Sequence, residues 1–268
     1  MDKTKIEWAE ATWNPVTGCL HGCEYCYARR IAERFSYEGQ TLDAPVELQG
    51  QWIEDARGLP SGCHVLREKV KLKDGGRIVP YPFAFAPTLH RYRLDEPEHW
   101  TKPRTIFVCS MADLFGTWVP VKWIVDVLGA CRRAPQHRYL FLTKNPDRYR
   151  ELDYMALLPH EENFWYGTSV TDDEAAQRPQ LMRLDTNTFW SMEPLIASVD
   201  MSAAKGCPKW VILGAETGNR RNKVRPRKEW IDSIVDLCDA HSVPVLMKDS
   251  LIPIVGAENM RRDFPWKK

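Results

Sequence analysis

Six short apolar runs follow one another after Pro103, and their spacing restricts the possible folds more than any other feature of the sequence. The runs are rich in β-branched and aromatic residues, and their starts lie 22 to 34 residues apart. They span residues 104–110, 138–143, 163–170, 187–193, 209–215 and 243–248. The stretches between them with helical character include 120–133, 172–184 and 227–241. This alternation predicts a parallel sheet with crossover helices.

The N-terminal segment adds one more unit of the same kind. Residues 6–18 hold apolar and aromatic residues before an Asn-Pro pair, which favours an extended segment that ends in a turn. Within residues 24–35, the spacing of Tyr27, Ile31 and Phe35, with Ala28 and Ala32 between them, predicts an amphipathic helix. We therefore expect an α/β fold, a partial or irregular TIM-like (β/α) barrel of about six to seven βα units. A doubly wound open sheet is the alternative, although the glycine pattern of its dinucleotide loop is absent.

Residues 39–103 interrupt this pattern. They are rich in glycine and proline and have few periodic apolar positions, which predicts a loop-rich insertion or lid after the first unit. Its section 81–93 interleaves aromatic residues with His90 and arginines, a mixture able to stack bases and pair phosphates. An ordered loop that packs on the barrel is an equally good interpretation. Because 268 residues with 44% hydrophobic content can bury one core, we expect a single domain over residues 1–268.

Charge and cysteine content restrict the compartment and the partners. A net charge of +1 argues against wholesale electrostatic capture of nucleic acid, although a local patch can still bind it. The eight cysteines are too sparse and unevenly spaced for a disulfide scaffold, so reduced intracellular thiols are expected. No run approaches the roughly 18 apolar residues of a membrane span, and the N-terminus is charged. These features predict a cytoplasmic protein without a membrane partner.

Three cysteines, Cys19, Cys23 and Cys26, lie within eight residues, and thiols so close together indicate a metal site. Thiolate is the soft ligand that selects zinc, copper(I) or an iron–sulfur cluster. Two glycines in the same stretch permit the loop to bend back. A structural zinc site normally has a fourth protein ligand. Three interpretations stay open: a centre with a free coordination position, a zinc knuckle completed by Cys63 or His64, and cysteines that bind no metal.

Polar residues end each of the six predicted strands. They are Ser110 and Asp113, Thr143 and Lys144, Thr168 and Ser169, Ser191 and Glu193, Glu216 and Thr217, and Lys248 and Asp249. In a β/α barrel these ends converge on one face, where the cysteine loop would also lie. Capping of the following helix is an equally good interpretation for each residue, and Asp113, Thr171 and Asp172 suit that role.

The cysteine loop resembles that of the radical SAM superfamily, in which a C-x3-C-x2-C loop holds three irons of a 4Fe-4S cluster and leaves the fourth iron to S-adenosylmethionine. Motifs across nearly the whole chain look like those of a phage-associated, three-Cys-motif family of uncharacterised radical-SAM-like proteins. The motifs occupy residues 13–19, 22–28, 107–115, 142–146, 191–195, 211–218 and 244–248. Many members of that family have a longer gap between the first two cysteines, whereas this chain has the three-residue gap of the wider superfamily.

The resemblance implies an enzyme that reductively cleaves S-adenosylmethionine at a 4Fe-4S cluster held by Cys19, Cys23 and Cys26. It also implies a one-electron reductant such as flavodoxin or ferredoxin. The residues suited to contact S-adenosylmethionine are Tyr25, Ser110, Ser169, Glu193 and Glu216.

Catalytic residues beyond the cofactor stay undefined, with Cys109, Lys144 and Asp113 as candidates. Cys109 would serve as a hydrogen-atom donor, and a small buried core thiol is the alternative interpretation. Lys144 and Lys248 can meet the cofactor carboxylate or a substrate phosphate, and an ion pair with Glu193 or Asp249 is the alternative.

The most basic segment, residues 219–228, contains six cations and no acid. Candidates for contacts to phosphate are Arg220, Arg221, Lys223 and Arg225, together with Lys248. A nucleic acid or nucleotide substrate is therefore favoured, with a solvated loop as the alternative. The opposing functional class is a zinc-stabilised nucleic-acid-binding protein without catalysis, and a phage structural or interaction protein is a third.

Overall fold

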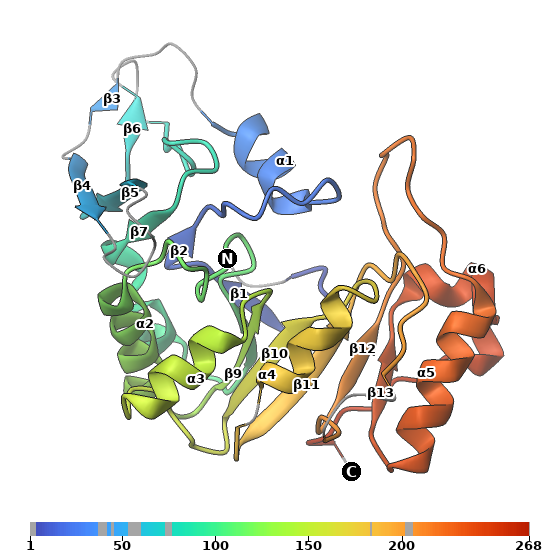
Figure 1. Cartoon of the computed structure of the whole chain (residues 1–268). Coiled ribbons are helices and arrows are strands. Elements are labelled where there is room, and N and C mark those ends of the chain that lie inside the picture. Colours follow the sequence, from blue (N-terminus) through green and yellow to red (C-terminus); the bar gives the residue numbers. More distant parts are fainter. Residues whose placement is uncertain are drawn as a thin grey trace. The chain divides into compact units, whose positions relative to one another are not determined.

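The computed structural model describes residues 4–36, 42–43, 46–52, 60–72, 77–182, 184–201 and 206–267. The chain divides into two compact units, Met1–Phe141 and Leu142–Lys268 (Figure 1). Both units mix helices with parallel strands, so the α/β class is confirmed. The prediction of a single domain stays a prediction.

Three parallel strands form the centre of the first unit. They are β1 (Ala11–Trp13), β8 (Thr105–Val108) and β9 (Arg138–Thr143), which are neighbours in that order. All four residues of β8 are buried, as expected for a parallel strand covered on both faces. Helix α2 (Val121–Arg133) connects β8 to β9 and buries one face that includes Trp123, Val127 and Cys131. The last two residues of β9 belong to the second unit.

A small second sheet in the first unit uses residues of the predicted insertion. Its strands lie in the order β2 (Val16–Thr17), β7 (Thr88–His90), β5 (Pro60–Leu66) and β4 (Val46–Trp52). Strand β3 (Leu42–Asp43) pairs with β6 (Lys71–Leu72), and the 3₁₀ helices η1 (Arg91–Arg93) and η2 (Glu96–His99) follow β7. The described part of the insertion is therefore more regular than the predicted loop-rich segment. The sequence did not indicate these strands, because short strands in a glycine-rich segment leave no clear apolar period. The rest of 39–103 lies outside the described residues.

Helix α1 (Tyr27–Arg34) follows the cysteine loop, as predicted, but with a different face buried. Ala28 and Ala32 pack in a cluster with other buried residues of the first unit. Tyr27, Ile31 and Phe35 are 47%, 38% and 52% exposed. The three large apolar residues of the predicted pattern thus lie on the exposed face, whereas the two alanines between them are buried.

Four parallel strands form the centre of the second unit. They are β10 (Phe164–Ser169), β11 (Asn187–Met192), β12 (Val211–Leu213) and β13 (Val245–Met247), in that order. The helical segments are α3 (Asp147–Tyr154), η3 (Ala175–Gln177), α4 (Arg178–Leu181), α5 (Lys228–Ala240), η4 (Asp249–Leu251), α6 (Ile252–Val255) and η5 (Ala257–Asn259). All six strands predicted after Pro103 are present, whereas α3 was not predicted.

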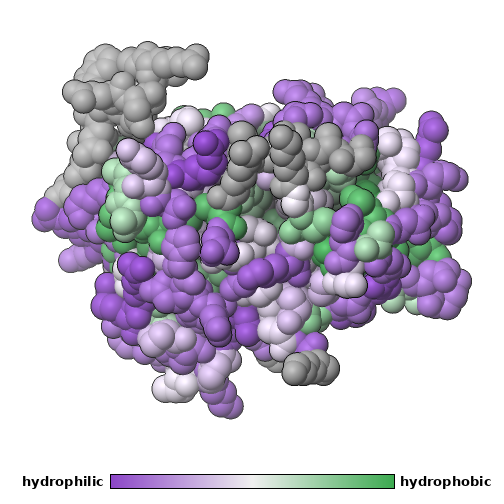
Figure 2. Space-filling view, turned by 60° about the horizontal axis from the view of Figure 1, so that its bottom comes forward, coloured by the Kyte–Doolittle hydropathy of each residue, from purple (hydrophilic) through white to green (hydrophobic). Residues whose placement is uncertain are grey.

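The surface seen in Figure 2 is mostly hydrophilic, with smaller hydrophobic areas between the polar side chains. Within the described residues, no helix is both long enough and apolar enough to cross a bilayer.

Candidate functional site

The cysteine loop is fixed at both of its ends. Gly18 has φ +88°, and a Cβ at this position would lie 2.2 Å from the carbonyl oxygen of Ala86, so only glycine fits. At the other end, the backbone N–H of Cys26 donates to the carbonyl oxygen of Cys23 at 3.2 Å. The Sγ atom of Cys26 then accepts a hydrogen bond from the backbone N–H of Arg29 at 3.3 Å and caps α1. The three thiols therefore lie in a loop that is held at one end by the close contact of Gly18 with Ala86 and at the other end by the N-terminus of α1.

The three thiols of the loop are free and partly exposed. Burial, and after it the charge of Asp113, raise the pKa of Cys19 to about 12. Among the described residues, no three His, Cys, Asp or Glu side chains are arranged to hold a metal ion. The donor chemistry fits a thiolate-bound centre, but the side chains would have to be drawn together to bind one.

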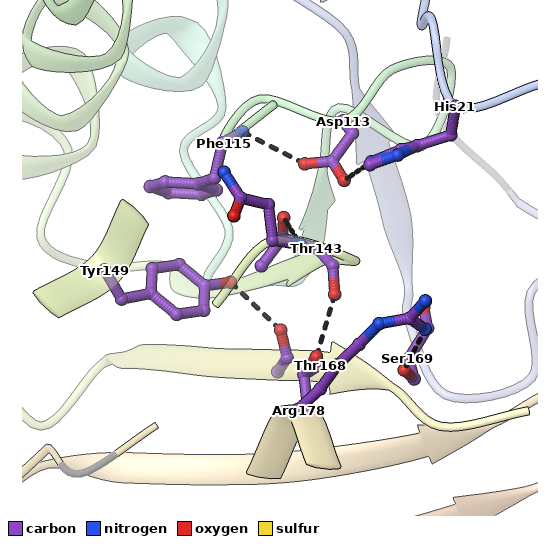
Figure 3. A network of polar contacts seen from close by, with 10 residues as sticks. His21, Asp113, Phe115, Thr143, Tyr149, Thr168, Ser169 and Arg178 are labelled. Atoms are coloured by element: carbon purple, nitrogen blue, oxygen red, sulfur yellow. Dashed lines mark hydrogen bonds and ion pairs between the residues drawn. The ribbon is translucent and has the colours of Figure 1, made fainter. Parts of the chain in front are cut away.

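His21, which lies between two of the cysteines, contacts a buried carboxylate. Its Nε2 atom lies 2.7 Å from Oδ2 of Asp113, and the other oxygen of Asp113 accepts a hydrogen bond from the backbone N–H of Phe115 at 3.1 Å (Figure 3). The His21 ring also meets Trp118 edge to face at 4.8 Å. Sequence reasoning did not single out His21, although its place inside the cysteine motif was a usable signal.

Asn14 was also missed, and it organises the loop after β8. Its Oδ1 atom accepts hydrogen bonds from the backbone N–H of Met111 at 2.9 Å and from Oγ of Ser110 at 3.2 Å. The carbonyl oxygen of Ser110 accepts a hydrogen bond from the hydroxyl of Tyr27 at 2.7 Å. Ser110 is thus already held by the residue after β1 and by the first residue of α1, while Tyr25 in the cysteine loop is half-buried.

Cys109 is a buried residue with a left-handed backbone. Its φ is +58°, and its backbone N–H donates to the carbonyl oxygen of Trp13 at 2.8 Å. Burial raises the pKa of its thiol to about 12. These observations support the core-thiol interpretation over the interpretation as a hydrogen-atom donor.

Cys63 and His64, the alternative zinc ligands, lie on β5 and take part in packing. Cys63 is buried and donates from Sγ to the carbonyl oxygen of Trp118 at 3.5 Å. The His64 ring stacks on Phe83 with 3.7 Å between centroids, and burial lowers the pKa of His64. Neither contact resembles metal ligation.

The basic, aromatic section 81–93 packs inside the first unit. His90 is fully buried, with Nε2 2.9 Å from Oγ1 of Thr17 and Nδ1 3.1 Å from the hydroxyl of Tyr92. Burial and the charge of Arg93 lower the pKa of His90 well below its ordinary value. The packing interpretation is therefore supported here.

In the second unit, the polar ends of β9 and β10 are joined by hydrogen bonds. Thr168 donates from Oγ1 to the carbonyl oxygen of Thr143 at 3.0 Å (Figure 3). Ser169 is buried, and its carbonyl oxygen accepts a hydrogen bond from Arg178 at 2.9 Å. Lys144 beside them is half-buried. Oδ1 of Asp172 accepts a hydrogen bond at 2.8 Å from the backbone N–H of Ala175, the first residue of η3, although Glu174 and not Asp172 is the N-cap of that helix.

Glu193 and Lys248 form an ion pair beyond the ends of β11 and β13. Oε2 of Glu193 lies 2.8 Å from Nζ of Lys248, and Oε1 accepts a hydrogen bond from Ser191 at 3.0 Å. A Cβ at Gly214 would lie 3.0 Å from Cδ of Lys248 and 3.2 Å from Cβ of Glu193. The absent side chain of Gly214 therefore leaves room for the pair, and the ion-pair alternative for Lys248 is observed.

Glu216 and Arg220 form a second pair just after β12. The guanidinium group of Arg220 donates two hydrogen bonds to the Glu216 carboxylate, from Nε to Oε1 at 2.7 Å and from Nη2 to Oε2 at 2.8 Å. The Glu216 side chain is only 2% exposed and that of Arg220 is 22% exposed. Arg220 is consequently engaged by the protein itself. Asp249, the last of the polar strand ends, pairs with Arg262.

A family model described as "Protein of unknown function (DUF5131)" matches residues 3–250. No curated protein and no solved structure matches the chain. The description of the family assigns no role to any residue of the two units.

Proposed function

This chain belongs to the DUF5131 family of proteins of unknown function, and we propose that it is a radical SAM enzyme. In this proposal Cys19, Cys23 and Cys26 bind a 4Fe-4S cluster, and S-adenosylmethionine is reductively cleaved there. The substrate that the radical attacks is not specified by these residues.

The observation that carries the proposal is the set of three free thiols in one loop between β2 and α1. All three thiols are part-exposed. Thiolate is the ligand that iron–sulfur clusters use, and three such ligands leave one iron without a protein ligand.

When bound, the cluster and S-adenosylmethionine supply one-electron cleavage of a sulfonium and a radical able to abstract hydrogen. The chain supplies the binding and the surroundings. Asp113 orients His21 inside the cysteine loop, and Asn14 holds the neighbouring backbone at Met111. Tyr25 and Ser110 in the first unit stay candidates for contacts to S-adenosylmethionine.

The proposal includes a partial TIM-like barrel, which the parallel strand order within each unit supports. In such a barrel Ser169, Glu193 and Glu216 of the second unit stay candidates for contacts to the cofactor. Glu193 and Glu216 would act as ion-paired carboxylates, since each already has a cationic partner. A cytoplasmic setting with flavodoxin or ferredoxin as reductant completes the proposal.

Anaerobic reconstitution with iron and sulfide tests the cluster. We expect brown protein with about four irons per chain. Cys23→Ala should lose this iron, whereas Cys207→Ala, which removes an exposed cysteine of the second unit, should retain it. Full iron content in Cys23→Ala, or a colourless protein with stoichiometric zinc, would contradict the ligand assignment.

Addition of dithionite and S-adenosylmethionine to the reconstituted protein tests the reaction. We expect 5′-deoxyadenosine from the native chain and from Cys207→Ala, and none from Cys23→Ala. An intact cluster that never yields 5′-deoxyadenosine would count against catalysis and leave only the metal site.

A further inference from the structure

The segment between β12 and α5 concentrates positive charge in a chain whose net charge is only +1. We call residues 219–228 the basic loop, which contains six cations and no acid. In Figure 1 the chain between β12 and α5 forms a long orange loop that extends away from both elements. Such a local excess of one charge creates a positive potential that the whole-chain charge hides.

Both ends of the basic loop are anchored in the second unit. At its start, Arg220 makes two hydrogen bonds to the buried carboxylate of Glu216. Near its end, Pro226 is buried just before α5 begins. Lys223 donates from Nζ to the carbonyl oxygen of Gly218 at 3.1 Å. These contacts restrict the loop, so its remaining cations are presented from a fixed base.

Three arginines of the basic loop are turned to solvent. Arg221, Arg225 and Arg227 are all exposed. Neither Arg221 nor Arg225 makes a hydrogen bond or an ion pair with any residue that the structure describes. Arg227 lies over the Trp230 ring, with 5.6 Å between its Cζ atom and the ring centroid. Two unneutralised guanidinium groups therefore remain available for an anionic partner.

We propose that the basic loop binds the phosphate backbone of duplex DNA, with Arg221 and Arg225 as its principal contacts. Duplex DNA carries one negative charge per about 1.7 Å of its axis, so closely spaced cations gain the most from it. Guanidinium groups also match phosphate in a two-bond geometry. Residues 219–228 contain no aromatic side chain, which single-strand binding would use to stack bases.

If the chain is a radical SAM enzyme, this inference makes DNA its substrate, and that part of the inference rests on the proposed function. Binding of DNA by the basic loop does not rest on that function, because it requires neither the cluster nor S-adenosylmethionine. Nucleic-acid binding and formation of 5′-deoxyadenosine can therefore fail or succeed separately.

Fluorescence anisotropy with a short labelled DNA duplex, measured on the full chain at several salt concentrations, tests the inference. The native chain should bind with an affinity that falls linearly with salt on logarithmic axes. Arg221→Ala/Arg225→Ala should give a slope shallower by about 1.8, because each neutralised phosphate accounts for about 0.9 of the slope. At 0.1 M salt, removal of each of the two arginines should weaken the affinity by about eightfold.

The matched control is Arg150→Ala/Lys209→Ala, which removes the same charge from two exposed sites of the second unit outside the basic loop. It should keep the native slope, and circular dichroism should show that both double variants are folded. An unchanged slope in Arg221→Ala/Arg225→Ala, an equal loss in the control, or tighter binding to the single strand than to the duplex would overturn the proposal. Absence of binding alongside normal 5′-deoxyadenosine formation would overturn it while leaving the enzyme proposal intact.

Discussion

The Nε2 atom of His21 lies 2.7 Å from Oδ2 of Asp113, a residue 92 positions further along the chain. This contact joins the cysteine loop to the segment that follows β8. The Asp113 side chain is only 8% exposed, and its second oxygen is already used by the backbone N–H of Phe115. One buried carboxylate thus holds the cysteine loop and shapes the turn beneath it.

Asp113→Ala should destabilise the first unit and release the cysteine loop. The substitution leaves the Phe115 N–H and the His21 ring without this acceptor, and an unsatisfied buried group costs about 1–3 kcal/mol. We expect that loss in urea unfolding, together with faster alkylation of Cys19 in the native state. Asp126→Ala, which breaks an exposed pair with Lys122, should cost less than about 1 kcal/mol. Equal losses in the two variants would show that Asp113 has no special anchoring role.

Substitutions at two adjacent positions of α1 should affect the free energy of unfolding to very different extents. Ile31 is 38% exposed and Ala32 is fully buried. Ile31→Ser should change the free energy of unfolding by no more than about 0.5 kcal/mol. Ala32→Leu should cost about 1–3 kcal/mol, because it adds volume to a packed cluster. A large loss for Ile31→Ser with none for Ala32→Leu would mean that α1 is turned the other way.

The difference between what the sequence predicted and what it missed follows from the range of the interactions involved. The strands after Pro103 were predictable because strands buried on both faces carry short apolar runs, such as residues 106–108 of β8 and 164–166 of β10. The buried face of α1 was not, because spacing alone does not say which neighbours cover a helix. Helix α3 was missed since five of its eight residues are charged and it buries Arg148 along with Tyr149 and Leu152.

The candidate site divides in the same way. The cysteine spacing is local and visible in the sequence, whereas the pairing of Glu216 with Arg220 occurs in a loop where no helical spacing indicates it. The partner of Asn14 is Met111, 97 positions away, and nothing local indicates such a contact. Asn14 reaches Met111 because β1 and β8 are neighbouring strands of the sheet.

The Glu193–Lys248 pair should show energetic coupling in a double-mutant cycle. The two side chains are 13% and 23% exposed, so removing one partner leaves a poorly solvated charge. Glu193→Gln and Lys248→Met should each destabilise the second unit, and the double variant should lose less than the sum. We expect a coupling energy of about 0.5–3 kcal/mol from chemical denaturation.

The exposed pair of Lys228 and Asp232 on α5 is the matched control for that cycle. Its side chains are 52% and 48% exposed, and its coupling should be only about 0.3–0.5 kcal/mol. Additive losses at Glu193 and Lys248 would mean that the pair contributes no more than a surface contact.

The first unit should lose stability when the pH falls below about 6.5, the ordinary pKa of histidine. Burial lowers the pKa of His90, and also those of His64 and His137, so the folded chain keeps these rings neutral. The unfolded chain binds protons to them more readily. Their contribution is therefore present above pH 6.5 and is lost progressively as the pH falls toward the lowered pKa values, by at most about 1.4 kcal/mol per pH unit for each ring.

His90→Asn isolates the contribution of the most deeply buried of these rings. The variant should be less stable than the native chain at about pH 7.5, since it disturbs the hydrogen bonds to Thr17 and Tyr92. Its unfolding free energy should nevertheless fall less steeply between about pH 6.5 and pH 5.5, because one fewer proton is taken up on unfolding. His241→Asn, at an exposed position, should keep the native slope. If His90→Asn also keeps that slope, protonation of His90 does not limit the acid stability of the first unit.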